Sequence, residues 1–202
     1  MTGTSRHLWL FLRSRHAALA ALWLVASAIV AWALLRASDD RTVIKLVLII
    51  VPLAPAVIIG AGQHSPFGEL ERTASHTLPA LRLAHLIGLL AVAGGAFAIA
   101  NSAANGEDFH WLLVRNGAGY AGIALLGGRL TGASFSWLPP LAYGLFVIVA
   151  PVGALLDRES RWLWPIQPPA ERSAIAIAAA LLLLGLVATI FLDARATTNE
   201  MA

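Results

Sequence analysis

The side chains that could do chemistry in this chain are few, and most lie at the ends of long apolar stretches. A haem group would need axial histidine pairs on facing membrane helices. His85 alone comes near the inside of an apolar stretch, and His64 lies just past another. Arg82, His85 and Arg129 stand at the ends of such stretches, from which long polar side chains can reach the membrane surface. No carboxylate falls mid-stretch, which argues against a proton-coupled or ion-coupled carrier.

Sequence motifs for hydrolysis and nucleotide binding are missing. The chain has no HExxH zinc motif, no GxSxG nucleophile motif and no GxxxxGKS/T phosphate loop. It also has no cysteine, which excludes disulfides, thiolate metal sites and cysteine nucleophiles. We therefore expect no catalytic residue, metal or cofactor in this chain, so that any ATP and Mg²⁺ would be held by another polypeptide.

The composition is that of a membrane protein. Of the 202 residues, 58% are hydrophobic and 12% are charged, and the mean hydropathy is +0.75. Soluble domains carry about 25% charged residues, so this chain lacks the polar surface that would keep it dissolved. No basic run is long enough to indicate nucleic-acid binding.

Six apolar stretches approach the ~20 residues that a helix needs to cross a bilayer. They cover residues 17–35, 43–62, 84–103, 114–130, 138–156 and 173–192. The first is longer than the apolar core of a signal peptide, so we expect it to be retained. The sequence thus predicts an all-α integral membrane protein with six transmembrane helices, forming a single transmembrane domain over 1–202.

Residues 1–16 and 157–172 flank the first and last of these stretches and carry candidate interfacial anchors. Tryptophan is enriched at headgroup depth, where arginine can meet lipid phosphate. Segment 1–16 is expected to be an N-terminal interfacial helix, with a frayed tail as the alternative. Segment 157–172 is expected to be an external loop with prolines that stop any helix. The anchors are Arg6, Trp9, Arg13, Arg15, Trp162 and Trp164.

The polar segment 63–79 has the pattern of a short amphipathic helix. Ser65 and Pro66 suit the N-cap and first helical position. Apolar residues then recur at helical spacing, and Pro79 ends the helix near Thr77 and opens the next one. The apolar positions are Phe67, Leu70, Ala74, Leu78 and Leu81. The alternative is an ordinary loop helix that merely closes the connection.

Orientation rests mainly on the N-terminal segment. Basic residues near the ends of the apolar stretches divide seven against seven between the two sides, so their number does not decide. Segment 1–16 holds three arginines and no acid, which favours an inside N-terminus. We expect both termini in the cytoplasm and the chain in the plasma or inner membrane.

Three strings in this layout, SPFGELERTA, RNGAGYAGIALLGGRLTGASFSWLPPLAYG and RWLWPIQPP, carry a family resemblance. The chain resembles the permease subunits of type-2 class ABC exporters, in particular small actinobacterial-like versions. The resemblance implies a cytoplasmic coupling helix that docks into a separate ATPase, short re-entrant helices in the external loop before the last span, and pairing with a second permease copy. The ATPase-coupling residues would be Pro66, Phe67, Gly68, Glu69, Leu70, Glu71 and Arg72.

The resemblance further implies export of a peptide, lipid or amphipathic small molecule. The chain departs from the family in being shorter than most such permeases and in having small external loops. Two other functions stay open. One is a non-transporting membrane scaffold or regulatory subunit, and the other is a membrane enzyme or haem protein. Co-purification with an ATPase and a haem absorption band would discriminate among them.

Overall fold

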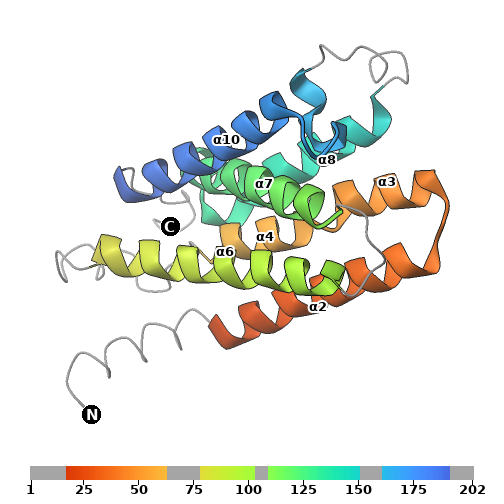
Figure 1. Cartoon of the computed structure of the whole chain (residues 1–202). Coiled ribbons are helices and arrows are strands. Elements are labelled where there is room, and N and C mark those ends of the chain that lie inside the picture. The colour runs from red at the N-terminus through yellow and green to blue at the C-terminus, as the bar shows by residue number, and fades with distance from the viewer. Residues whose placement is uncertain (1–16, 63–77, 103–108, 151–160, 192–202) are drawn as a thin grey trace.

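The computed structural model describes residues 17–62, 78–102, 109–150 and 161–191, and all regular elements in these ranges are helices (Figure 1). The expected all-α class is therefore confirmed for this part of the chain. The α-helices are α2 (Ala17–Ala37), α3 (Arg41–Ile50), α4 (Leu53–Ala61), α6 (Leu78–Ser102), α7 (Phe109–Thr131), α8 (Leu138–Val149) and α10 (Arg172–Phe191). Two short 3₁₀ helices, η1 (Ala133–Phe135) and η2 (Arg161–Ile166), precede α8 and α10.

Four helical segments are long and apolar enough to cross a membrane. They are Ala17–Ala37, Arg41–Ala61, Leu81–Ala100 and Arg172–Phe191. Their outward faces carry large apolar side chains, such as Trp23 on α2, Ile99 on α6 and Leu183 on α10, all more than half exposed. An apolar outer surface is what lipid requires of a protein, so the chain is built for a membrane-embedded position.

The other two expected spans differ from these four. Helix α7 has 23 residues but contains Arg115, Asn116 and Arg129, which are buried inside the bundle. Helix α8 has 12 residues, and the remainder of the expected 138–156 stretch lies mostly outside the described ranges. Six membrane crossings therefore remain a prediction.

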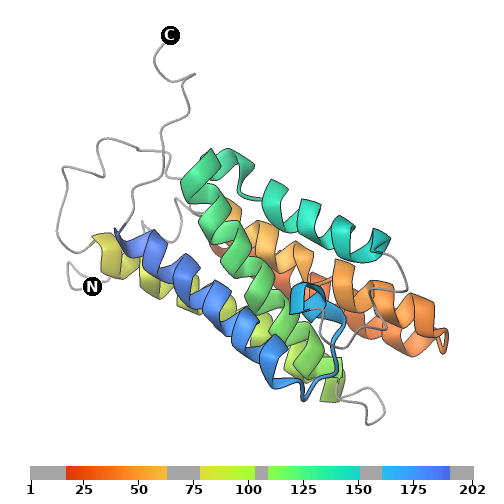
Figure 2. The ribbon, with the colours of Figure 1, turned by 90° about the horizontal axis from the view of Figure 1, so that it is seen from above.

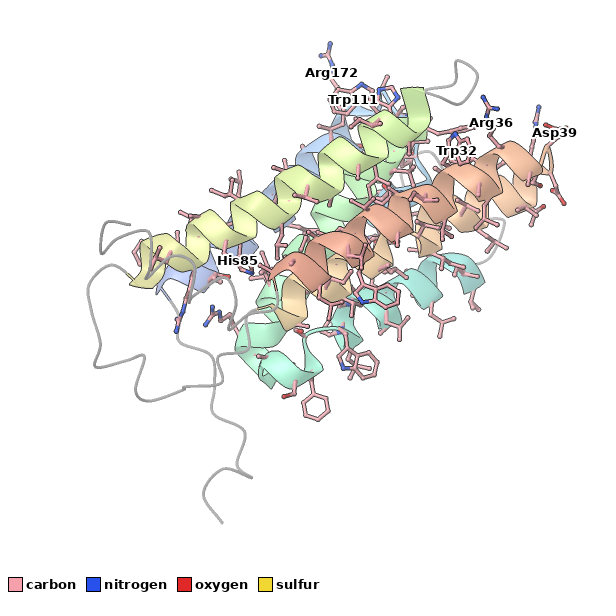
Figure 3. The ribbon with its side chains drawn as sticks, turned by 90° about the horizontal axis from the view of Figure 1, so that it is seen from below. Trp32, Arg36, Asp39, His85, Trp111 and Arg172 are labelled. Carbon is pink, nitrogen blue, oxygen red and sulfur yellow. The ribbon has the colours of Figure 1, made fainter. Side chains whose placement is uncertain are left out.

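Helix α7 lies at the centre of the bundle. It contacts α4, α6, α8 and α10 (Figures 1 and 2). Successive passes run in alternating directions, so the turn from α2 to α3 and the start of α7 lie at one end, called the 37–41 end here. Helix α4 ends and α6 begins at the opposite end, called the 62–78 end. In Figure 3, Arg36 and Asp39 mark the first end and His85 lies near the second.

Several expected boundaries are corrected. The stretch 43–62 is divided into α3 and α4, because Pro52 has no N–H to continue the α-helical hydrogen-bond ladder. Val51 and Pro52 keep right-handed helical backbone angles, so the break between α3 and α4 is an interruption of the hydrogen bonds within one apolar pass. Helix α7 begins at Phe109, five residues before the expected start. Helix α6 begins at Leu78, next to the expected start at Pro79.

Helices α7 and α10 approach so closely that glycine is needed on both. A Cβ added to Gly122 of α7 would collide with the backbone of Leu181 and stand 2.5 Å from the nitrogen of Leu182. On α10, a Cβ at Gly185 would stand 2.8 Å from the carbonyl oxygen of Gly122. Small residues that let backbones meet are a common source of helix association in membranes.

This contact predicts that Gly122→Ala destabilises the bundle. The added methyl group meets backbone atoms that cannot rotate away, and overpacking of this kind costs about 1–3 kcal/mol. The matched control is Gly95→Ala on α6, where an added Cβ has nothing within 4 Å. We expect a lower midpoint of thermal unfolding in detergent for Gly122→Ala and an unchanged or slightly higher one for Gly95→Ala. Equal midpoints would contradict the close α7–α10 packing.

Candidate functional site

The candidate site begins at the break between α3 and α4. Pro52 has no N–H to donate to Leu48, four residues earlier, so the Leu48 carbonyl loses its helical partner. Pro55 likewise leaves the Val51 carbonyl without one, but that oxygen accepts a bond from the Ala54 N–H at 3.1 Å. In an apolar surrounding an unsatisfied backbone group costs several kcal/mol. The Leu48 carbonyl therefore needs a donor from elsewhere.

Asn116 of α7 supplies that donor. Its Nδ2 atom donates to the Leu48 carbonyl oxygen at 2.9 Å and to the Pro165 carbonyl oxygen at 2.9 Å. The Asn116 side chain is fully buried. A primary amide has two N–H groups, and both are used on backbone oxygens from segments far apart in the sequence.

Arg115, the neighbouring residue, binds the same part of the chain. Its Nη1 donates to the Pro168 oxygen at 2.8 Å, and its Nη2 contacts the oxygens of Trp164 and Gln167 at 2.9 Å each. Nη2 also lies 3.2 Å from the Pro165 oxygen. Arg115 is 6% exposed, so carbonyl dipoles stand where water would otherwise solvate the guanidinium.

We call the side chains of Arg115 and Asn116, with the carbonyls that they bind, the Arg115–Asn116 node. The two side chains also contact each other, since Arg115 Nε donates to Asn116 Oδ1 at 3.3 Å. The node joins α3, α7 and the chain from 164 to 168. Apart from Arg115 Nε, its donors bind backbone oxygens, so the node holds these segments together. Among the described residues, no group of three or more His, Cys, Asp or Glu side chains could hold a metal ion.

Three aromatic rings pack beside the node. The Trp164 ring lies 5.5 Å from Tyr120 and 6.2 Å from Tyr143, to which it is nearly parallel. Gly119 makes room for it, because a Cβ there would stand 2.7 Å from Trp164 Cζ2. The Tyr143 hydroxyl donates to the carbonyl of Trp162. Segment η2 is thus held through its side chains as well as its backbone.

Trp164 departs from the expected interfacial anchors. It is 2% exposed and contacts protein, whereas Trp162 is 79% exposed. The Trp164 ring fits inside the bundle because Gly119 has no side chain to occupy that space. The expectation that both tryptophans face the membrane interface is corrected for Trp164.

Other aromatic and charged groups gather at the 37–41 end in Figure 3, where Trp111 is exposed and the Arg36 guanidinium lies over the Trp32 ring.

The basic residues expected to reach the surface near the 62–78 end are also more buried than expected. Arg129 is 6% exposed, and its Nη2 atom lies 3.3 Å from the carbonyl oxygen of Thr189 on α10. His85 is 7% exposed (Figure 3). The close α7–α10 approach brings Arg129 to the C-terminal turn of α10, where carbonyl oxygens favour a cation.

The remaining predicted site residues lie outside the described ranges. These are the anchors Arg6, Trp9, Arg13 and Arg15 and the coupling residues Pro66, Phe67, Gly68, Glu69, Leu70, Glu71 and Arg72. Their roles stay predictions. Sequence reasoning missed Arg115 and Asn116 as a site because it started the fourth span at residue 114. An arginine followed by an asparagine well inside an apolar helix was the available signal.

Comparison of the chain with protein-family models, curated proteins and solved structures finds no match.

The node predicts that Arg115→Met destabilises the protein although methionine suits an apolar interior. The substitution removes one donor from each of four backbone carbonyls. The oxygens of Trp164, Pro165 and Pro168 keep a donor from Gln167 N, Asn116 Nδ2 and Glu171 N, and the Gln167 oxygen loses the Arg115 donor that it has. Since an acceptor left without a partner costs about 1–3 kcal/mol, we expect a loss of about 1–3 kcal/mol in unfolding free energy. The control is Arg172→Met, at an exposed position at the start of α10. Unfolding in mixed micelles measures both. A loss no larger for Arg115→Met than for Arg172→Met would contradict a structural role for the node.

Proposed function

We propose that this chain is the membrane permease subunit of an ATP-driven exporter. It works with a separate ATPase and a second permease copy, identical or different, in the cell membrane. Its cargo is a peptide, a lipid or an amphipathic small molecule. The observation that carries the proposal is the proline-interrupted pass α3–α4, whose second half ends at Ala61, just before the polar segment 63–79. Apolar segments interrupted by proline or glycine are a pointer to the binding sites of transporters.

The tight packing of α4 supports a mechanical role for that half-helix. A Cβ added to Gly60 would stand 3.0 Å from Ala124 Cβ on α7 and 2.9 Å from Ser136 Oγ, just after η1. Leu53, the first residue of α4, packs against Gly144 of α8 so closely that a Cβ there would stand 2.9 Å from Leu53 Cδ1. A displacement imposed on the end of α4 therefore passes directly into α7 and α8.

The expected 65–77 helix, within the polar segment 63–79, is the proposed receiver of that displacement. With both termini in the cytoplasm, the 62–78 end faces the cytoplasm, where an ATPase would dock. Phe67 and Leu70 would be apolar anchors, and Glu69, Glu71 and Arg72 could pair with charges on the ATPase. A proline at 66 and a glycine at 68 flank the first anchor.

The proposal predicts that Phe67→Ala and Glu69→Lys weaken binding of the ATPase. The first substitution removes an apolar anchor and the second reverses a charge, so less ATPase should co-purify with the tagged full-length chain and coupled ATP hydrolysis should fall. We expect a reduction of roughly tenfold in association, as for the loss of ~1.4 kcal/mol. Mass spectrometry should identify the co-purified polypeptide as one with a GxxxxGKS/T phosphate loop.

Asp39→Lys is the matched control for Glu69→Lys. It reverses an acidic side chain that is exposed at the 37–41 end (Figure 3), away from the proposed ATPase side. This variant should retain the ATPase at the wild-type level. If Phe67→Ala and Glu69→Lys retain it equally well, the coupling role of the expected 65–77 helix is wrong. If no polypeptide with a phosphate loop accompanies the wild-type chain, the permease function is contradicted.

A further inference from the structure

We infer that Asn116 couples the break between α3 and α4 to the chain from 164 to 168, so that the two change position together. All the contacts involved lie within this chain, so the coupling requires no ATPase, cargo or second copy.

The first ground is the pair of carbonyls that Asn116 binds. The Leu48 oxygen has no helical donor, because residue 52 is a proline. The Pro165 oxygen lies in a segment whose next proline is Pro168, three residues later. Prolines donate no backbone hydrogen bond. Each segment therefore takes donors from α7. The Pro165 oxygen accepts from Asn116 Nδ2 at 2.9 Å and from Arg115 Nη2 at 3.2 Å, and the Asn116 amide is the group that binds both segments.

The second ground is the fixed position of Asn116. It is fully buried on the central helix α7, and its Oδ1 atom accepts from Arg115 Nε. The two N–H groups of an amide lie in one plane at a fixed angle. A hydrogen bond at 2.9 Å is lost when its atoms separate by much more than 0.5 Å. A movement of α3 that withdraws the Leu48 oxygen would thus free the amide to turn away from Pro165.

The third ground is the apolar contact on the other side of η2. Ile49, next to Leu48, forms a buried cluster with Leu163 of η2 and Val147 of α8. Asn116 itself is fully buried, so a hydrogen bond that its amide loses is not replaced from solvent. Movement of α3 at the break therefore affects η2 through both its backbone and its side chains.

The test uses the natural absence of cysteine. Gln167→Cys introduces a single thiol beside the node and leaves the backbone oxygen that Arg115 binds in place. The rate at which a maleimide labels it, in nanodiscs that expose both membrane faces, reports release of the 164–168 chain. In this background we expect Asn116→Leu to raise the labelling rate by roughly tenfold, the change that corresponds to loss of ~1.4 kcal/mol.

Two proline substitutions separate coupling from a general disturbance. Pro52→Ala restores the N–H that can bind the Leu48 carbonyl, so the break should close and labelling at residue 167 should rise. Pro55→Ala is the matched control. The carbonyl that lacks a helical donor because of Pro55 is that of Val51, and it is bound by the Ala54 N–H and not by Asn116. Labelling should stay at the background rate in that variant.

A cysteine in the core distinguishes release of the segment from unfolding. Ala124 is fully buried on α7, so Ala124→Cys should stay unreactive in each variant. If Asn116→Leu exposes this core position too, the comparison of Pro52→Ala with Pro55→Ala decides. The inference is overturned if Pro52→Ala leaves residue 167 as protected as Pro55→Ala does. It is equally overturned if Asn116→Leu folds normally and labels at the background rate.

Discussion

Every backbone carbonyl inside an apolar bundle needs a hydrogen-bond donor, and this requirement organises the rest of the structure. Prolines at 52, 165 and 168 remove donors where α3 meets α4 and where the chain passes from η2 to α10. Arg115 and Asn116 supply the replacements from a single turn of α7. The two breaks are tolerated because one polar pair serves both.

Helix α7 has two kinds of contact with its neighbours, close packing at its glycines and hydrogen bonds from its polar residues. Its glycines admit neighbours at contact distance, with the α10 backbone at Gly122, the Trp164 ring at Gly119 and Pro139 at Gly127. Its polar residues near either end bind carbonyls of other segments, through the node at one end and through Arg129 at the other. Helix α7 is more polar than the four long apolar segments, yet it packs against three of them, α3–α4, α6 and α10, while α2 packs mainly on α6.

The apolar stretches were predictable because hydropathy and length depend on local sequence alone. The expected 17–35 and 173–192 match α2 (Ala17–Ala37) and α10 (Arg172–Phe191) closely. The node was not predicted, because its bonds join residues about fifty or more positions apart. The burial of Trp164 was not predicted for the same reason. Its neighbours in sequence are typical of an interfacial tryptophan, and its contact with Gly119 is evident only in the folded chain. The break at Pro52 did have a local signal, since a proline inside a helical stretch removes a hydrogen bond wherever it stands.

The node also constrains how the protein can be made. Arg115 emerges from the ribosome 49 to 53 residues before the carbonyls that will receive its guanidinium. An arginine in an inserting helix costs up to about 2.5–3.5 kcal/mol, the value at the helix centre. Asn116 adds a further polar group. Until residues 164–168 have been synthesised, Arg115 and Asn116 lack the carbonyl partners in that segment, and α7 is costly to place in lipid. Its stable insertion therefore belongs to a late step of biogenesis, after residues 164–168 have been synthesised.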